Sequence, residues 1–403
     1  MKSLLTSIFL ILFHLVSFSQ KSVKIKEGNW TAALQLTEKE ALPFQLIIQK
    51  TKKQYEFIIV NGEEKIKLND IEQKEDSLIV SFSEYNSQLV FKPSKTNLKG
   101  YWLNKNKLNY KLPFSANFGY TSRFKDEIGN KPINVNGKWK VYFSPKTKSE
   151  YVAIGLFKQH ETKLTGTFLT ETGDFRFLEG NQFGNQLYLS CFDGSHAFLF
   201  KAKIENDSIK GKFYSGKHYE DIWEGVNAPN FELTNPYEIT KPINNSPLSF
   251  SCKDLDGNTF QFPNEQFKNK AVIIQIMGTW CPNCTDETNT FKELYKEYQS
   301  KGFEFIAIGF ENGKEEDCYA LLKKFKEKKN IQYTVLYGGN AKRATADIIF
   351  TMLDGVKSFP TTIYIGKDGL IKKVYSGFNG PGTGEYYDQY LEQTKKLIEE
   401  MVR

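Results

Sequence analysis

Two patterns of hydrophobic and polar residues divide the chain. Up to about residue 226, short runs such as Phe44–Ile48 and Ser77–Phe82 mix apolar with polar positions, and turn residues such as Asn61-Gly62 separate them. This alternation predicts strands with one buried face, joined as antiparallel hairpins. From about residue 248, nearly continuous apolar runs such as Ala271–Met277 alternate with segments of helical spacing. This second pattern predicts an α/β domain whose strands are covered on both faces.

The β-rich part contains an internal repeat. Gly28-Asn29-Trp30 opens one half and Gly137-Lys138-Trp139 opens the other, while Gly100-Tyr101-Trp102 and Gly211-Lys212-Phe213 lie near the two ends. We therefore expect a first β unit over residues 20–130 and a second β unit over residues 131–226, each a barrel or a sandwich. The Gly-x-Trp openings loosely resemble those of lipocalin-like barrels.

A proline-rich stretch separates the two patterns. Residues 227–247 hold Pro229, Pro236, Pro242 and Pro247, which predicts an extended linker. Residues 248–403 then predict the order β-hairpin, βαβα, ββ, α. The expected elements are strands at 249–253, 259–262, 271–277, 303–309, 361–365 and 371–375, and helices around 291–298, 315–328 and 385–402.

The first nineteen residues differ from the rest of the chain. Lys2 precedes a mostly apolar run, Leu4–Phe18, which ends in Ser17-Phe18-Ser19. The run is short for a membrane span of roughly 20 residues, and small residues at its end favour cleavage. We interpret residues 1–19 as a secretory signal peptide, so the protein is expected to be exported, with no transmembrane span after cleavage.

Charge and cysteine content narrow the class of protein further. The formal net charge of +7 is spread over interleaved basic and acidic residues, which does not favour nucleic acid binding. Five cysteines occur, too few and too scattered for a disulfide scaffold, and only one pair is closely spaced: Cys191, Cys252, Cys281, Cys284 and Cys318. The close pair is therefore the candidate for chemistry. Cys191 and Cys252 are expected to be half-buried core residues, and Cys318 is expected to be a passive thiol, with a regulatory partner as the alternative.

Cys281 and Cys284 lie where a buried strand passes into an amphipathic helix. Unpaired backbone N–H groups and the helix dipole favour a thiolate at a helix N-terminus. A free thiol has a pKa of roughly 8.5, and such positions lower it to about 7 or below. We expect Cys281 to be the nucleophile and Cys284, one turn further on, to resolve the mixed disulfide.

Two other interpretations of the pair explain less. A zinc site needs four ligands, but the sequence has no second close cysteine pair and its histidines are far apart: His14, His160, His196 and His218. We therefore predict no metal. A permanent structural disulfide gives no reason for the position between strand and helix. Asp193 and His196 fall in a predicted turn, and we interpret this lone histidine as a surface residue.

From Pro247 to Arg403 the chain resembles the thioredoxin superfamily, and within it the TlpA/ResA-like exported oxidoreductases with an AhpC/TSA-redoxin-like domain. The motifs are Trp280-Cys281-Pro282-Asn283-Cys284 after a buried strand and Phe359-Pro360-Thr361 before a strand hairpin. The resemblance implies that Pro360 is cis and lies beside the sulfurs, with Trp280, Pro282, Asn283 and Thr361 around them. Pro282-Asn283 departs from the common Gly-Pro or Glu-Pro and leaves the direction of electron flow open.

The resemblance also implies a proton carrier. Thioredoxins have a buried acid six residues before the first cysteine, where this chain has Gln275. ResA-like proteins instead place a glutamate three residues after the second cysteine, and Glu287 matches that position. Glu287 would then exchange a proton with Cys284. The alternative is a solvated glutamate on the helix face.

These features predict a periplasmic reductant of protein disulfides, which needs no bound cofactor and receives electrons from a membrane donor, as the family resemblance implies. An oxidant or isomerase on the same dithiol is one alternative. A thiol peroxidase is another, although Ile274 and Gly278 stand where peroxiredoxins carry Pro and Thr or Ser. A third is a binding module, in which the β units recruit a ligand or a client protein.

Overall fold

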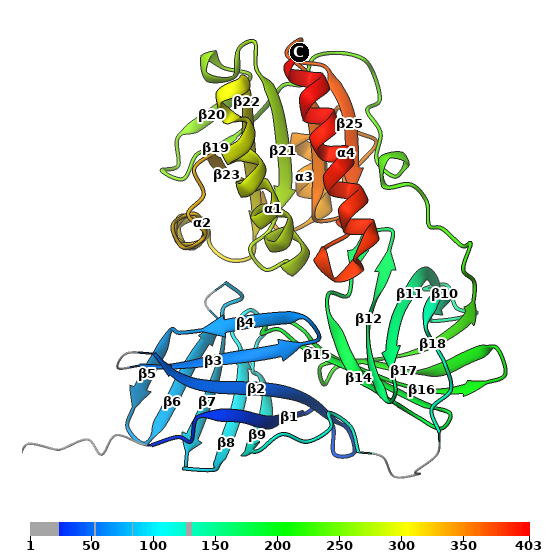
Figure 1. Ribbon diagram of the computed structural model, residues 1–403. Coiled ribbons are helices and arrows are strands. Elements are labelled where there is room, and N and C mark those ends of the chain that lie inside the picture. Colours follow the sequence, from blue (N-terminus) through cyan, green and yellow to red (C-terminus); the bar gives the residue numbers. More distant parts are fainter. Residues whose placement is uncertain (1–23, 52–53, 83, 126–130) are drawn as a thin grey trace, which may run out of the picture.

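The computed structural model describes residues 24–51, 54–82, 84–125 and 131–403. The predicted signal peptide lies outside these residues. Figure 1 shows two β units lying side by side, with an α/β domain above them that carries the C-terminus. Within the described part of the chain, no helix is both long enough and apolar enough to cross a bilayer.

The first β unit is an antiparallel sheet of nine strands in the order β4-β3-β2-β1-β9-β8-β7-β6-β5. Alternate side chains of strands such as β2 and β6 are buried in its interior, as the period of two requires. The strands are β1 Gly28–Gln35, β2 Ala41–Thr51, β3 Gln54–Asn61, β4 Glu64–Leu68, β5 Ile71–Lys74, β6 Ser77–Phe82, β7 Ser87–Pro93, β8 Asn97–Asn104 and β9 Tyr110–Phe118.

The second β unit is a closed antiparallel barrel. Its strands follow the order β11-β10-β18-β17-β16-β15-β14-β12, and pairing of β11 with β12 closes the ring, which leaves β13 at the side of β12. The strands are β10 Gly137–Phe143, β11 Tyr151–His160, β12 Lys163–Thr170, β13 Gly173–Asp174, β14 Leu178–Phe183, β15 Gln186–Phe192, β16 Ala197–Glu205, β17 Ser208–Ser215 and β18 Tyr219–Asn227. The prediction of two repeated β units is thus confirmed.

The repeated residues hold equivalent places in the two units. Trp30 and Trp139 are buried at the first strand of each unit, and each indole donates to the carbonyl four residues earlier. Gly100 and Gly211 lie in the next-to-last strands, where an added Cβ would stand 2.0 Å from the carbonyl oxygen of Val90 or 2.1 Å from that of Lys201. Only glycine allows this close approach of the backbones.

The two β units are packed against each other. Phe192, from β15 of the second unit, lies in the hydrophobic core of the first, where its ring is 4.8 Å from that of Phe44. The Asn61 side chain, at the end of β3, donates to the backbone carbonyl of Phe192 over 2.9 Å. The buried guanidinium of Arg123, which follows β9, donates both to the Val60 carbonyl of the first unit and to the Ser190 carbonyl of the second. The two β units therefore share a packed interface rather than being joined only through the chain.

The proline-rich linker is extended but not free. After the short 3₁₀ helix η1, Pro236–Glu238, it pairs with the α/β domain through bridges at Pro242 and Pro247. The ring of Tyr237 packs edge to face on that of Tyr375, 4.9 Å away. The linker thereby fixes the barrel beside the α/β domain.

The α/β domain has a seven-stranded mixed sheet in the order β20-β19-β23-β22-β21-β24-β25. Alternate residues of β21 face opposite sides: Ile273 packs with α1, α2 and α4, whereas Ile274 packs with α3. The strands are β19 Phe250–Lys253, β20 Thr259–Phe262, β21 Ala271–Met277, β22 Phe303–Glu311, β23 Thr334–Asn340, β24 Thr361–Ile365 and β25 Ile371–Ser376. The helices are α1 Pro282–Tyr298, α2 Glu315–Lys329, α3 Arg343–Ile349 and α4 Glu385–Val402, with the 3₁₀ turns η2 Glu265–Phe267, η3 Gln299–Lys301 and η4 Pro381–Thr383.

The predicted order of this domain was incomplete, because β23 and α3 were not foreseen. β23 ends in Gly338, Gly339 and Asn340, residues that weaken a strand pattern. Helix α3 has seven residues, fewer than a periodic pattern needs to stand out. The strand is held by parallel pairing with β22, a long-range contact that local spacing does not encode.

Candidate active site

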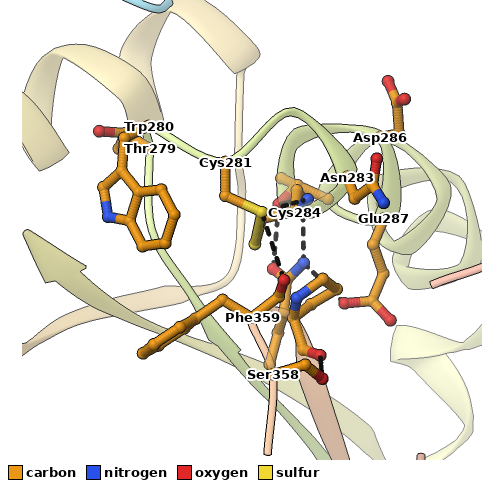
Figure 2. The surroundings of a disulfide bond; sticks show 12 residues. Thr279, Trp280, Cys281, Asn283, Cys284, Asp286, Glu287, Ser358 and Phe359 are labelled. Atoms are coloured by element: carbon orange, nitrogen blue, oxygen red, sulfur yellow. Dashed lines mark hydrogen bonds between the residues drawn. A yellow bond between two sulfur atoms is a disulfide. The ribbon is translucent and has the colours of Figure 1, made fainter. Parts of the chain in front are cut away.

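The two close cysteines form a disulfide at the start of α1. Their Cα atoms are 5.3 Å apart, and Cys284 is completely buried while Cys281 keeps 7% of its surface exposed. The sulfur of Cys281 faces the carbonyl oxygen of Phe359 at 3.5 Å, as Figure 2 shows. Cys281 is thus the sulfur that an incoming group can reach.

Local geometry explains why the cysteines lie at this junction. Strand β21 ends at Met277, the chain turns through Gly278, and Cys281 becomes the N-cap of α1. Pro282 occupies the first turn, where its missing N–H costs nothing. The Cys281 sulfur accepts a hydrogen bond from the Cys284 backbone N–H over 3.2 Å. The helix N-terminus is therefore directed at Cys281, the arrangement that favours a thiolate after reduction.

The residues predicted to surround the sulfurs are brought together. The Phe359-Pro360 peptide is cis, and Phe359 presents its carbonyl to Cys281. Thr361, the first residue of β24, is buried and donates to the carbonyl of Ser358. Trp280 is half-buried, with its indole N–H on the Phe310 carbonyl and its ring 5.6 Å from that of Phe359. Trp280 and Phe359 form an aromatic border beside Cys281.

Glu287 is completely buried, so it is not a solvated residue of the helix face. Its carboxylate accepts hydrogen bonds from the hydroxyls of Thr362 and Tyr390 and from the side-chain amide of Gln275. Burial raises the pKa of Glu287 to about 7. Gln275 also donates to the carbonyl of Cys284, over 3.0 Å, so one amide bridges the carboxylate and the backbone of the second cysteine. Glu287 can hold or release a proton near neutral pH beside Cys284.

A second buried acid, which the sequence analysis missed, supports the turn before the cysteines. Glu311, the last residue of β22, accepts from the backbone N–H and the hydroxyl of Thr279, at 2.7 and 2.9 Å. Burial raises the pKa of Glu311 to about 7. Glu311 could have been found from the sequence, because it is an acid at the carboxyl end of a buried parallel strand that neighbours the strand before the cysteines.

The second β unit also reaches the cysteines, which the sequence analysis did not foresee. The Asn283 side chain, between the two cysteines, donates to the backbone carbonyl of Asp174 over 3.2 Å. The Asp174 carboxylate accepts from the backbone N–H of Gly380, at 2.6 Å. Arg176 forms ion pairs with Asp286 of α1, at 2.5 Å, and with Glu64 and Asp193. The β13 region is therefore part of the surroundings of the site.

Asp193 and His196 lie in the predicted turn, between β15 and β16, and the His196 side chain is 31% exposed, but the burial of Asp193 was not foreseen. Asp193 is completely buried, and its carboxylate lies 3.1 Å from the ring of His196 and 3.3 Å from Arg176. These charges lower the pKa of Asp193 to about 2, although burial opposes them. A charged partner from another strand made this burial possible, and the sequence pattern contains no sign of it.

The remaining cysteines are not part of the site. Cys191, Cys252 and Cys318 are buried free thiols in the part of the chain that the structure describes. Burial raises the pKa of each thiol. A buried thiol with a raised pKa is a poor nucleophile, which agrees with passive roles.

A mixed sheet flanked by helices, with a Cys-x-x-C disulfide at a helix N-terminus and a cis-proline loop beside it, defines a thioredoxin-like oxidoreductase. Residues 224–391 match the Redoxin family. The chain is 32% identical over 169 residues to the thiol-disulfide oxidoreductase ResA of Bacillus thuringiensis subsp. konkukian (strain 97-27), a match that covers 41% of this chain and 88% of the relative. The ResA of Halalkalibacterium halodurans is 27% identical over 153 residues, or 38% of this chain and 74% of that relative.

The chain therefore belongs to the ResA family of thiol–disulfide oxidoreductases. Among solved structures, a thiol:disulfide interchange protein of the thioredoxin family from Chlorobium tepidum TLS is similar, with 22% identity and a TM-score of 0.31. That match covers 40% of this chain and 98% of the other. The Redoxin match, at residues 224–391, lies in the C-terminal part of the chain and leaves the first β unit and nearly all of the second outside it.

Proposed function

We propose that this oxidoreductase is exported and reduces disulfides in client proteins, with Cys281 as nucleophile and Cys284 as resolving thiol. The observation that carries the proposal is the asymmetry of the pair. Cys281, at the helix N-cap, keeps 7% of its surface exposed, whereas Cys284 is completely buried. The attacking thiol must reach the client, and the resolving thiol needs to reach only Cys281.

The exchange conserves atoms and electrons. The Cys281 thiolate attacks one sulfur of a client disulfide, a mixed disulfide forms, and the other client sulfur leaves as a thiolate. Cys284 then loses its proton and attacks Cys281, which releases the second client thiolate. The client has gained two electrons, and the enzyme ends as the Cys281–Cys284 disulfide.

Glu287 is proposed to serve the second step. Its carboxylate is linked through Gln275 to the backbone of Cys284 and titrates near neutral pH. It could therefore take the proton that Cys284 loses, and return it when the enzyme is reduced again. Pro360, Trp280 and Thr361 are proposed to shape the groove in which the client disulfide lies.

The reductant must be reloaded by an external dithiol. We propose a membrane-bound electron donor outside the cytoplasm. The predicted signal peptide and the membership of the ResA family support this compartment.

The direction of electron flow is tested by the reduction potential of the Cys281/Cys284 pair, with Cys281→Ser as control. Full-length protein is equilibrated in dithiothreitol or glutathione buffers, and its free thiols are counted. A value near about −270 mV, as in thioredoxin, supports a reductant, whereas a value near about −120 mV, as in the oxidant DsbA, contradicts one. The Cys281→Ser variant should show no two-electron couple.

A further inference from the structure

The contact between the second β unit and the cysteine pair is closely fitted. An added Cβ on Gly173 would stand 2.3 Å from the Asn283 side-chain nitrogen, and one on Gly377 would stand 2.8 Å from the Thr172 carbonyl carbon. On Gly382 it would stand 2.9 Å from the carbonyl oxygen of Arg176. Glycines on both sides thus let two backbones approach more closely than side chains would allow.

Buried ion pairs hold the same contact together. Arg176 has 6% of its side chain exposed, and its three carboxylate partners come from the first β unit, the second β unit and α1: Glu64, Asp193 and Asp286. Removing one member of a buried ion pair is costly, because the remaining charge stays buried. The cluster therefore favours the arrangement in which the β13 region lies against Cys281.

This arrangement places a small cavity, of about 240 Å³, at the reactive sulfur. Cys281 lies in its lining, with aromatic rings on both sides: Phe175, His196 and Phe198 from the second β unit, Trp280 and Phe359 from the α/β domain. Thr172 lies at its exposed edge. The volume is below the roughly 300 Å³ at which small-molecule sites begin, so one side chain of a client suits it better than a folded surface.

The polar groups of the cavity wall are already occupied. The Asp174 carboxylate accepts from the backbone N–H groups of Arg176 and Gly380, at 2.5 and 2.6 Å. The His196 ring lies against the Asp193 carboxylate and stacks on Phe198, 4.4 Å away. What remains available to a client is mainly aromatic surface, which gains most from burying another apolar or aromatic side chain.

We propose that the second β unit completes the substrate site, and that its wall of Phe175, His196 and Phe198 selects client cysteines that have a large apolar or aromatic neighbour in an extended segment. The proposal rests on the thiol–disulfide exchange proposed above. It makes the β unit a specificity-determining part of the enzyme rather than a spacer. Such a side chain enters the cavity while its neighbouring half-cystine meets Cys281.

The test compares two disulfide-linked peptide dimers that differ only in having Phe or Ser directly after the cysteine. Reduced full-length enzyme should react about tenfold faster with the Phe peptide, which corresponds to about 1.4 kcal/mol. Thr172→Trp places an indole in the cavity and should lower this preference to less than about threefold. His196→Ala removes part of the wall without adding bulk, and should lower it too.

The matched control is Ser149→Trp, in an exposed turn of the same barrel that does not line the cavity. It should keep the wild-type preference. Equal rates for the two peptides in the wild type, or a preference that survives both wall variants, would overturn the proposal.

A binding measurement separates this proposal from the proposed reaction. The double variant Cys281→Ser, Cys284→Ser cannot exchange disulfides, and S-methylated peptides cannot react. If the methylated Phe peptide binds more tightly than the methylated Ser peptide, and Thr172→Trp abolishes this difference, the proposed role of the aromatic wall is supported even if the enzyme is not a reductant. Equal binding of both peptides contradicts the proposed selectivity of the aromatic wall, whatever the reduction potential.

Discussion

Replacing Glu287 by Gln should change how the stability of the protein depends on pH. The carboxyl is completely buried, and its pKa rises from 4.5 to about 7 on folding. Because the folded pKa is the higher one, the unfolded chain releases this proton at a lower pH than the folded chain does. The contribution of Glu287 to stability is therefore greatest below about pH 4.5 and falls as the pH rises through 7.

The size of the effect follows from the two pKa values. One pKa unit corresponds to about 1.4 kcal/mol, so ionisation of Glu287 lowers the free energy of unfolding by about 3 kcal/mol between acidic and slightly alkaline pH. Glutamine cannot ionise, so Glu287→Gln lacks this loss. The variant also replaces an acceptor of the Gln275 amide by a donor, and this cost is the same at every pH.

The measurement is a set of urea titrations of the oxidised protein from about pH 5 to pH 8, read by far-ultraviolet circular dichroism. The free energy of unfolding of the wild type minus that of the variant should fall by about 2.5 kcal/mol over this range, because at pH 5 part of the unfolded chain is already ionised at this position. Groups common to both proteins, Glu311 among them, cancel in the difference. Glu293→Gln is the control, because Glu293 is an exposed residue of the same helix whose ion pair with Lys296 is screened by solvent. If the difference in the free energy of unfolding between wild type and Glu287→Gln stays constant with pH, the conclusion that Glu287 is buried with a raised pKa is refuted.

Three further changes test other parts of the structure. Cys284→Ser should trap a mixed disulfide between Cys281 and a client, visible by non-reducing electrophoresis, and a failure to trap would contradict the assigned order of attack. Arg176→Met should lower the free energy of unfolding by about 3–5 kcal/mol, since buried carboxylates lose their cation, whereas the exposed Arg343→Met should change it little; equal effects would contradict the cluster. Gly211→Ala should cost about 1–3 kcal/mol by overpacking against Lys201, measured by urea titration, and a neutral result would contradict the close approach.

The strands and the cysteine pair could be predicted because their signals are local. Alternation over Ser77–Phe82 predicts β6 with the bounds that the structure has, and the apolar run Ala271–Met277 predicts β21 equally well. The position of Cys281 follows from the same run, since the motif comes directly after it. In each case neighbouring residues contain the whole pattern, so no distant contact is needed.

The parts that escaped prediction depend on partners far away in the chain. Arg176 is paired with Asp286, 110 positions later, and Glu64, 112 positions earlier. Asp193 is buried because Arg176 and His196 compensate its charge. Taken alone, each of these residues has the character of a surface residue. Their burial becomes favourable only when three units of the chain meet, which a linear pattern does not encode.

The dipeptide between the cysteines acquires a second role from this arrangement. A residue at position 283 alters the surroundings of the disulfide, but Asn283 also donates to Asp174 of the second β unit. Asp286, two residues after Cys284, is held by Arg176 of the same unit. The N-terminal turn of α1, which we propose stabilises a Cys281 thiolate, is thus joined to the barrel by two contacts. A motion that moved the β13 region away from Cys281 would have to break one or both of these contacts, so under the proposed function client access would be linked to the surroundings of the proposed nucleophile.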